Sequence, residues 1–106
     1  MNNAIEIVTF NLNATATKEQ VLATTPAMQE FLNQQPGFLY RSLSCDEQGL
    51  WFDIVYWENQ QAAQAGGEAF MKSAAGAALM PLIDAASCKM RHMDALSAVL
   101  ADSLAA

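Results

Sequence analysis

Two tryptophans and an aspartate alternate along one short stretch of the chain, Gly49–Asn59, whose sequence is GLWFDIVYWEN. In a strand, Trp51, Asp53 and Trp57 point to the same side, because successive residues face opposite sides of a sheet. The two indoles could stack on a planar aromatic ligand, with Val55 between them, or they could fill the core of a dimer. This pattern predicts a cavity wall in which Trp51 and Trp57 are candidate ligand-binding residues.

Asp53 and His92 are the candidate catalytic residues. Asp53 could act as a general base, because burial among indoles favours the protonated form of a carboxylate. Alternatively, it forms an ion pair with Arg91 or Lys89. His92 is the only histidine. It could shuttle protons near neutral pH, or it could be a core or rim histidine on the side of its strand that faces the helices. Arg91 is also a candidate ligand-binding residue.

Two tyrosines could donate hydrogen bonds to a ligand, although Tyr56 is expected to pack beneath the helices; Tyr40 is the better candidate for a binding residue. Cys45 and Cys88 form neither a disulfide framework nor a metal site, because zinc needs about four ligands and the chain has no Cys-x-x-Cys. The sequence contains no glycine-rich phosphate loop and no Gly-x-Ser-x-Gly motif. It therefore predicts no metal and no cofactor.

The composition excludes several classes of partner. At 106 residues the chain makes one domain, and its hydrophobic content of 53% favours a homodimer over a monomer with ordinary exposed apolar surface. The net charge of −6 argues against nucleic acid, because phosphate binding needs clustered Lys and Arg. We find no membrane-spanning run and no signal peptide, so we expect no membrane contact and a cytoplasmic protein.

Hydrophobic periodicity and capping signals predict the order strand, helix, strand, strand, helix, strand over residues 1–94. The first helix should begin at a Thr17 capping box, and Pro26 should either kink it or start a second segment capped by Thr25. Asn59 should cap the second long helix, and residues 74–83 should form a short helical piece or a loop. The four expected strands are Ala4–Leu12, Phe38–Cys45, Gly49–Asn59 and Ser87–Asp94.

This order is that of a ferredoxin-like βαββαβ fold in the α+β class. Right-handed crossovers give a four-stranded antiparallel sheet in the order fourth, first, third, second, with both helices on one face. We expect the apolar side of the third strand, which includes Phe52 and Ile54, to meet the helices. The tryptophan side should meet a second copy of the chain, so that two sheets pair as a dimeric α/β barrel.

Residues 95–106 should form a short amphipathic C-terminal tail. Twelve residues make a marginal helix alone, so the tail needs a surface on which to dock. Its helical stripe comprises Leu96, Val99, Leu100 and Leu104.

The chain resembles the dimeric α/β-barrel superfamily, and within it the antibiotic-biosynthesis-monooxygenase domain, over residues 4–94. The resemblance rests on Gln35–Phe38 before the second strand, Asp53–Glu58 before the second helix, Phe70–Met71, and Met90–Met93 in the last strand. It implies a cofactor-independent monooxygenase that acts on a small aromatic or polyketide-like substrate. The substrate's own carbanion would reduce oxygen, and the protein would supply desolvation, orientation and one base. The alternative is a non-catalytic dimer of the same fold that binds a small apolar ligand or is only structural.

Haem-degrading members of the superfamily resemble one another in a strand asparagine, a tryptophan before the second helix and a histidine on that helix. Here Trp57 matches the tryptophan and Asn11 could match the asparagine, which makes Asn11 a candidate ligand-binding residue. No histidine lies between Asn59 and Ser73, so the position of the haem ligand is unfilled. A fully paired Asp53 would favour the binding protein, whereas a titratable group in the cavity would favour the enzyme.

Overall fold

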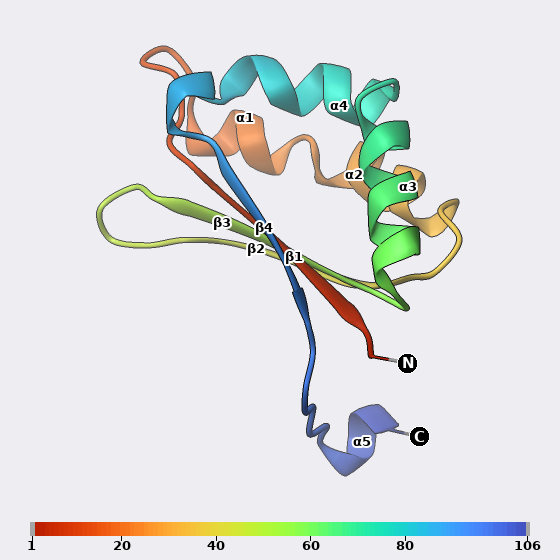
Figure 1. Cartoon of the computed structure of the whole chain (residues 1–106). Coiled ribbons are helices and arrows are strands. Elements are labelled where there is room, and N and C mark those ends of the chain that lie inside the picture. The colour runs from red at the N-terminus through yellow and green to blue at the C-terminus, as the bar shows by residue number, and fades with distance from the viewer. Residues whose placement is uncertain (1, 106) are drawn as a thin grey trace.

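The computed structural model describes residues 2–105, and it has the predicted α+β architecture (Figure 1). One antiparallel sheet contains all four strands in the order β2-β3-β1-β4, which confirms the predicted order. β3 and β1 are therefore the central strands, and β2 and β4 are the edges. The strands are β1 (Ala4–Phe10), β2 (Phe38–Cys45), β3 (Trp51–Trp57) and β4 (Lys89–Asp94).

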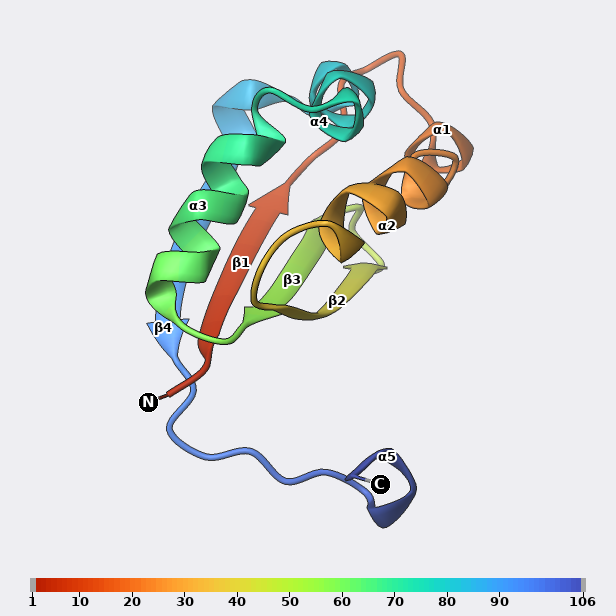
Figure 2. The same cartoon turned by 90° about the vertical axis from the view of Figure 1, so that its right-hand side faces the viewer.

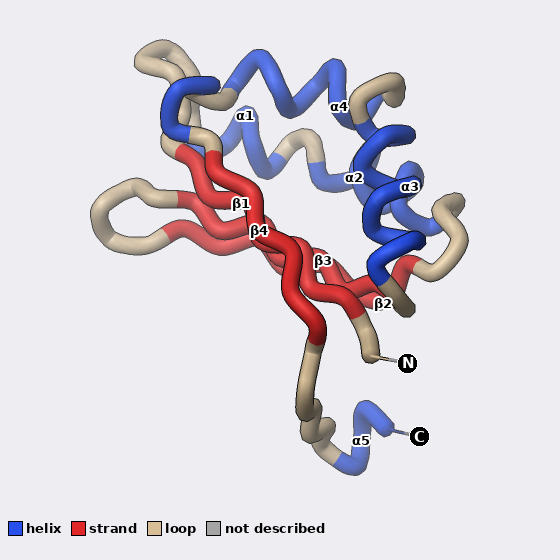
Figure 3. Tube along the Cα trace, in the orientation of Figure 1, coloured by secondary structure: helices blue, strands red, loops and turns tan. Residues whose placement is uncertain are grey.

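The main helices all lie on one face of the sheet, as Figures 1 and 2 show from two directions. Figure 3 shows the same separation by secondary structure, with the helices on one side of the strands. No helix within residues 2–105 is long and apolar enough to cross a membrane. The helices of this layer are α1 (Lys18–Leu22), α2 (Thr25–Asn33), α3 (Gln60–Phe70) and α4 (Ala74–Leu79), followed by 3₁₀ turns at Met80–Leu82 and Ala85–Ser87.

α1 and α3 begin where the capping signals predict. At the start of α1, Thr17 Oγ1 accepts a hydrogen bond from the N–H of Gln20 at 3.2 Å, and Gln20 Oε1 accepts one from the N–H of Thr17 at 2.9 Å. At the start of α3, Asn59 Oδ1 accepts from the N–H of Ala62 at 2.8 Å. These bonds satisfy backbone donors that the first helical turn leaves free.

A second helical segment begins at Thr25 with Pro26 in its first turn, so Pro26 does not kink a single helix. Thr24, one position before the predicted Thr25, occupies the N-cap position of α2, but its side chain makes no capping hydrogen bond. The Thr24 hydroxyl donates to the carbonyl oxygen of Val21 at 2.6 Å, so it closes the end of α1 and does not cap α2.

The prediction of which face of β3 meets the helices is wrong. The side chains of Trp51, Asp53, Val55 and Trp57 are buried on the helix side, and those between them are only partly buried on the other side. The prediction placed the Asp53 side away from the helices because it carries a carboxylate. In the structure, a cation of the same chain balances this charge, so the carboxylate needs neither solvent nor a dimer interface.

Gly66 on α3 makes room for the largest buried side chain. A Cβ at this position would collide with Cη2 of the Trp57 indole, so only glycine lets the helix lie directly over the ring. Trp57 is 1% exposed and packs edge to face on Phe38, with ring centroids 5.9 Å apart. The contact fixes the middle of α3 over the last residue of β3.

The opposite face of the sheet is not covered by any helix of the described chain (Figure 1). The β1–β3 register places apolar side chains of both central strands on this side, with Ile7 opposite Ile54 at its centre. Basic side chains of the edge strand β4 flank them. We call this surface the open face; it comprises Ile5, Ile7, Tyr40, Phe52, Ile54, Tyr56, Lys89, Arg91 and Met93.

The first strand begins where the last strand ends. Ala4 pairs with Asp94, and the N–H of Ala95 donates to the carbonyl oxygen of Asn3 at 2.8 Å. After β4 the chain runs away from the sheet and the helix layer toward α5 (Asp102–Ala105), as Figure 2 shows.

The predicted tail helix is absent over residues 96–101, and α5 (Asp102–Ala105) is a single turn. Leu96 and Val99 are 86% and 93% exposed, so the tail finds no apolar surface on its own chain to stabilise a longer helix. The side chain of Leu104 lies outside the described residues.

Candidate functional site

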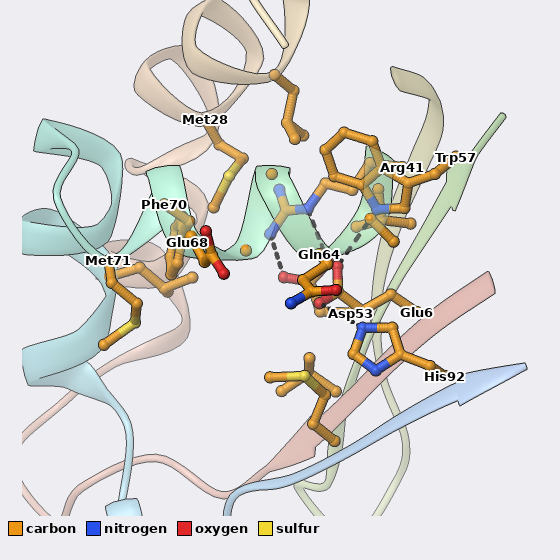
Figure 4. Close-up of a pocket in the computed structure, with 18 of the residues that line it drawn as sticks. Glu6, Met28, Arg41, Asp53, Trp57, Gln64, Glu68, Phe70, Met71 and His92 are labelled. Atoms are coloured by element: carbon orange, nitrogen blue, oxygen red, sulfur yellow. Dashed lines mark hydrogen bonds and ion pairs between the residues drawn. The ribbon is translucent and has the colours of Figure 1, made fainter. Parts of the chain in front are cut away.

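A cavity of about 630 Å³ lies between the sheet and the helix layer (Figure 4). Its lining is mostly apolar, with Met28 and Leu32 from α2, Phe70 from α3 and Val55 from β3. Small-molecule sites in proteins commonly have volumes of about 300–1,000 Å³ and similar apolar walls. The size and lining therefore suit a ligand of a few fused rings.

Polar side chains enter the cavity from every strand and from α3. Each of the four strands supplies one polar side chain, and α3 supplies three from the side of the helix that faces the cavity. These residues are Glu6, Arg41, Asp53, Gln60, Gln64, Glu68 and His92. Because they come from five elements, the site depends on the whole sheet being assembled.

Asp53 is ion-paired, but its partner is Arg41 on β2 and not the predicted Arg91 or Lys89. Arg41 Nε donates to Oδ1 at 2.9 Å and Arg41 Nη2 donates to Oδ2 at 2.7 Å, which makes a bidentate pair. The two side chains are only 9% and 12% exposed. Both carboxylate oxygens are therefore occupied by guanidinium donors.

The register of β2 explains why Arg41 is the partner. An irregularity between Phe38 and Tyr40 shifts the β2–β3 pairing, so that Arg41 lies opposite Val55 on the cavity side. Arg91 belongs to β4, which β1 separates from β3, and it lies opposite Ile7 on the open face. An ion pair between Arg91 and Asp53 would have to cross the sheet.

Glu6 joins the site from β1, and sequence reasoning missed it. Its Oε1 accepts a hydrogen bond from Trp57 Nε1 at 3.3 Å, and its Oε2 lies 3.3 Å from His92 Nε2. Glu6 and His92 are direct neighbours across the β1–β4 pair. A detectable signal was present, since Glu6 shares its side of the strand with Val8 and Phe10, and a carboxylate on an otherwise apolar strand face often has a function or a partner.

His92 lies on the helix side of the sheet, as predicted from the alternation along β4. Its side chain is 38% exposed, compared with 11% for Glu6, so it lies nearer to solvent than the carboxylate. Figure 4 shows His92, Glu6, Asp53 and Trp57 grouped at one end of the cavity, with Met71 and Glu68 toward the other. The structure thus brings together three of the predicted residues, Asp53, Trp57 and His92.

Trp51 does not line the cavity. It is 4% exposed and stacks on Phe10, with ring centroids 6.2 Å apart and planes inclined by 3°. It belongs to the hydrophobic core of this chain, on the helix side of the sheet. Trp57, in contrast, is both buried core and part of the cavity lining.

Three other predicted ligand-binding residues lie away from the cavity. Tyr40 is 59% exposed on the open face, where it packs edge to face with Tyr56. Tyr56 therefore does not pack beneath the helices as expected. Arg91 is also on the open face, and Asn11 is exposed after β1, where its N–H donates to Ser87 Oγ at 2.8 Å.

The described part of the chain holds no group of three or more His, Cys, Asp or Glu that could bind a metal ion. Cys45 and Cys88 are free thiols near opposite edges of the sheet. The ionisable side chains that the described chain places along the cavity are the Asp53–Arg41 pair, the Glu6–His92 pair and Glu68.

Comparison with known proteins identifies the fold. No family model matches the sequence, and no curated protein matches it. SnoaB, a cofactor-independent oxygenase from Streptomyces nogalater, is similar in structure with a TM-score of 0.73 and 14% identity, over 93% of this chain and 98% of its own. A monooxygenase from the gene ActVA-Orf6 of Streptomyces coelicolor, in complex with nanaomycin D, has a TM-score of 0.71 and 24% identity, over 95% and 94% of the two chains.

A dimeric ferredoxin-like protein of unknown function from Thermobifida fusca also matches, with a TM-score of 0.71 and 15% identity over 89% of this chain and 92% of its own. Other matched structures include a haem-degrading protein. The chain has the fold of dimeric α/β-barrel proteins of the antibiotic-biosynthesis-monooxygenase type. Proteins with this fold include oxygenases, haem-degrading proteins and proteins of unknown function, so the fold does not decide the activity.

Proposed function

We propose that this protein is a cofactor-independent monooxygenase-like enzyme that acts on a small aromatic, polyketide-like substrate in the cavity. The observation that carries the proposal is the Glu6–His92 pair, which lies at one end of a mostly apolar cavity and could accept a proton. Two proteins of the same fold support it: one is described as a cofactor-independent oxygenase, and the other binds nanaomycin D, an aromatic polyketide.

In this proposal His92 is the base and Glu6 is a positioning residue. If the imidazole is neutral and its proton is on Nε2, which lies 3.3 Å from Glu6 Oε2, then Nδ1 is the proton acceptor. The Trp57 indole N–H holds the other oxygen of Glu6 and so fixes the orientation of the pair. Asp53, the other candidate base, is committed to Arg41 through both oxygens, and we assign it a structural part in forming the cavity floor.

The reaction needs an aromatic substrate whose C–H bond is acidic enough to lose a proton. In an anthrone, the methylene between the two rings gives a carbanion that the carbonyl stabilises. The carbanion transfers one electron to O₂, and the radical pair combines into a C–O bond. The resulting peroxide anion takes back the proton that His92 removed, which gives a hydroperoxide. Loss of water breaks the O–O bond and removes the second C–H proton, which leaves a ketone. The substrate supplies all the electrons, and one oxygen atom enters the product while the other leaves in water.

The test uses 1,8-dihydroxyanthrone in air-saturated buffer, with oxygen uptake and anthraquinone absorbance followed together. We expect the protein to accelerate oxidation above the spontaneous rate with one O₂ consumed per quinone. His92→Phe should reduce the catalysed rate by about 100-fold or more, as loss of a general base does, while ligand binding persists. Lys18→Gln, an exposed change on α1, is the control and should leave the rate unchanged.

A ligand-binding protein without catalysis is the second candidate, and the Asp53–Arg41 pair favours it, since a paired Asp53 offers no free base. The same assay separates the candidates. Binding of the anthraquinone product with no acceleration of anthrone oxidation would support the binding protein and contradict the enzyme.

We also propose that the working form is a homodimer joined through the open face. The matched T. fusca protein is described as dimeric, and here the partly buried apolar side chains of β1 and β3 lie on a sheet surface without cover from the described chain. A second copy would bury this surface, since apolar area removed from water is the main favourable term in association. We therefore keep the proposal of a dimer, but we place its interface on the open face and not on the tryptophan side of β3.

A further inference from the structure

Both basic side chains that line the cavity, Arg41 and His92, already lie against carboxylates. Arg41 gives two hydrogen bonds to Asp53, and His92 lies at hydrogen-bond distance from Glu6. The remaining basic residues of the sequence, Lys18, Lys72, Lys89 and Arg91, are not among those that line the cavity. An anionic ligand would therefore find no uncommitted cation along the lining.

The cavity also carries an excess of negative charge. Its lining holds three carboxylates, those of Glu6, Asp53 and Glu68, and one guanidinium, that of Arg41. With His92 neutral, three negative charges and one positive charge give a net charge of −2. The whole chain, at −6, has the same sign, so its wider field adds to that of the cavity.

Glu68 is the carboxylate of this group without an ion-pair partner among the described residues. It is exposed on α3 and lies beside Phe70 and Met71, away from the buried pairs (Figure 4). A ligand entering the cavity on this side would pass close to a charge that no cation of the described chain compensates.

We infer that the cavity selects uncharged planar aromatic molecules and rejects carboxylates of the same shape. This inference rests on the proposed function and narrows its substrate class. A ligand carboxylate would lose hydration against apolar walls, meet like charge, and gain no salt bridge. A neutral phenol meets none of these costs, and its hydroxyl can donate to the carboxylates that line the site.

The experiment compares two ligands that differ in charge but hardly in shape: the 3-carboxamide and the 3-carboxylate of 1,8-dihydroxyanthraquinone. Dissociation constants are measured by isothermal titration calorimetry at low and high salt. At low salt we expect the carboxamide to bind about tenfold more tightly or better, a difference of about 1.4 kcal/mol. The ratio should shrink at high salt, because screening weakens repulsion by exposed charges.

Charge variants assign the effect to the cavity. Glu68→Lys should reduce the preference for the carboxamide several-fold, and Glu68→Gln should reduce it by less. Glu30→Lys makes the same change in net charge on the exposed side of α2, outside the cavity lining, and should leave the ratio unchanged.

Equal binding of the two ligands, tighter binding of the carboxylate, or an equal response to Glu30→Lys and Glu68→Lys would overturn the inference while leaving the proposed function intact. If neither compound binds at millimolar concentration, both the inference and the proposed function fail.

Discussion

Arg41 and Asp53 are held together by two short hydrogen bonds where neither charge has much contact with water. Removing one member of such a pair leaves the other charge buried and uncompensated. Arg41→Met should therefore lower the free energy of unfolding by about 3–5 kcal/mol. Urea denaturation at one fixed protein concentration measures the change, because oligomerisation makes stability depend on concentration.

The double variant Arg41→Met/Asp53→Leu is the matched control. It removes both charges and fills the space with apolar groups, so it should recover most of the lost stability. A loss below about 1 kcal/mol for Arg41→Met alone, the value of a solvent-exposed pair, would contradict the buried geometry.

At the residue scale, alternation along the strands predicted that Asp53 and Trp57 share a face and that His92 faces the helices. It could not give their partners. Arg41 faces the cavity because of an irregularity in the β2–β3 register, and Glu6 meets His92 because β1 and β4 pair in one particular register. Such registers depend on tertiary packing and are invisible to the local sequence pattern.

At the scale of elements, the contact between α3 and β3 depends on one glycine. Gly66→Ala would drive a Cβ into the Trp57 indole, so we expect it to destabilise the fold by about 1–3 kcal/mol, the usual cost of overpacking. Thermal and urea unfolding would measure the loss.

Gly67 provides a matched control in the same helix. A Cβ at Gly67 meets nothing nearer than Glu6 Oε2 at 3.9 Å, so Gly67→Ala should stabilise the helix by about 0.5–1 kcal/mol. If the two substitutions had the same effect, helix propensity would explain both and the close contact with Trp57 would not.

Element order, strand order and the caps of α1 and α3 were predictable because they depend on local periodicity and short capping motifs. The orientation of β3 was not, since both of its sides carry large side chains. Two contacts with other elements determine this orientation: Gly66 leaves room for Trp57, and Arg41 on the neighbouring strand pairs with Asp53. Neither contact is between residues close together in the sequence. The tail helix was predicted from periodicity alone, without a surface to stabilise it.

At the scale of the whole molecule, the open face should join two copies. Ile54 lies at its centre, opposite Ile7, so Ile54→Glu would place two charges close together in the proposed interface. We expect the variant to sediment as an 11.5 kDa monomer at micromolar concentration, where the wild type sediments as a dimer.

Leu22→Glu makes an equally large change on the helix side, where the side chain is 51% exposed, and should leave the dimer intact. A wild-type protein that sediments only as a monomer, or a dimer that survives Ile54→Glu and dissociates with Leu22→Glu, would show that the interface lies elsewhere.

The tail is expected to be dispensable for the folded domain. A chain ending at Ala95 keeps the hydrogen bond to Asn3, and the tail residues Leu96, Val99 and Leu100 that it loses are largely exposed. Its melting temperature, at matched concentration, should lie within about 3 °C of the full chain, less than a change of 1 kcal/mol would cause in a domain of this size. A larger fall would mean that the tail contacts the domain or its partner copy.

The hydrogen bond between Asn3 and Ala95 also bears on how freely the chain could be reconnected. β1 and β4 are neighbours, and the start of β1 lies beside the end of β4, so a short linker could join residue 95 to residue 3. New termini could then be placed in the exposed turn at Glu47–Gln48. Circular permutation succeeds where termini lie close together and the new break falls in an exposed loop. The β2-β3-β1-β4 sheet thus fixes which strands are neighbours, but the same neighbours could form from a chain in which the strands follow one another in a different order.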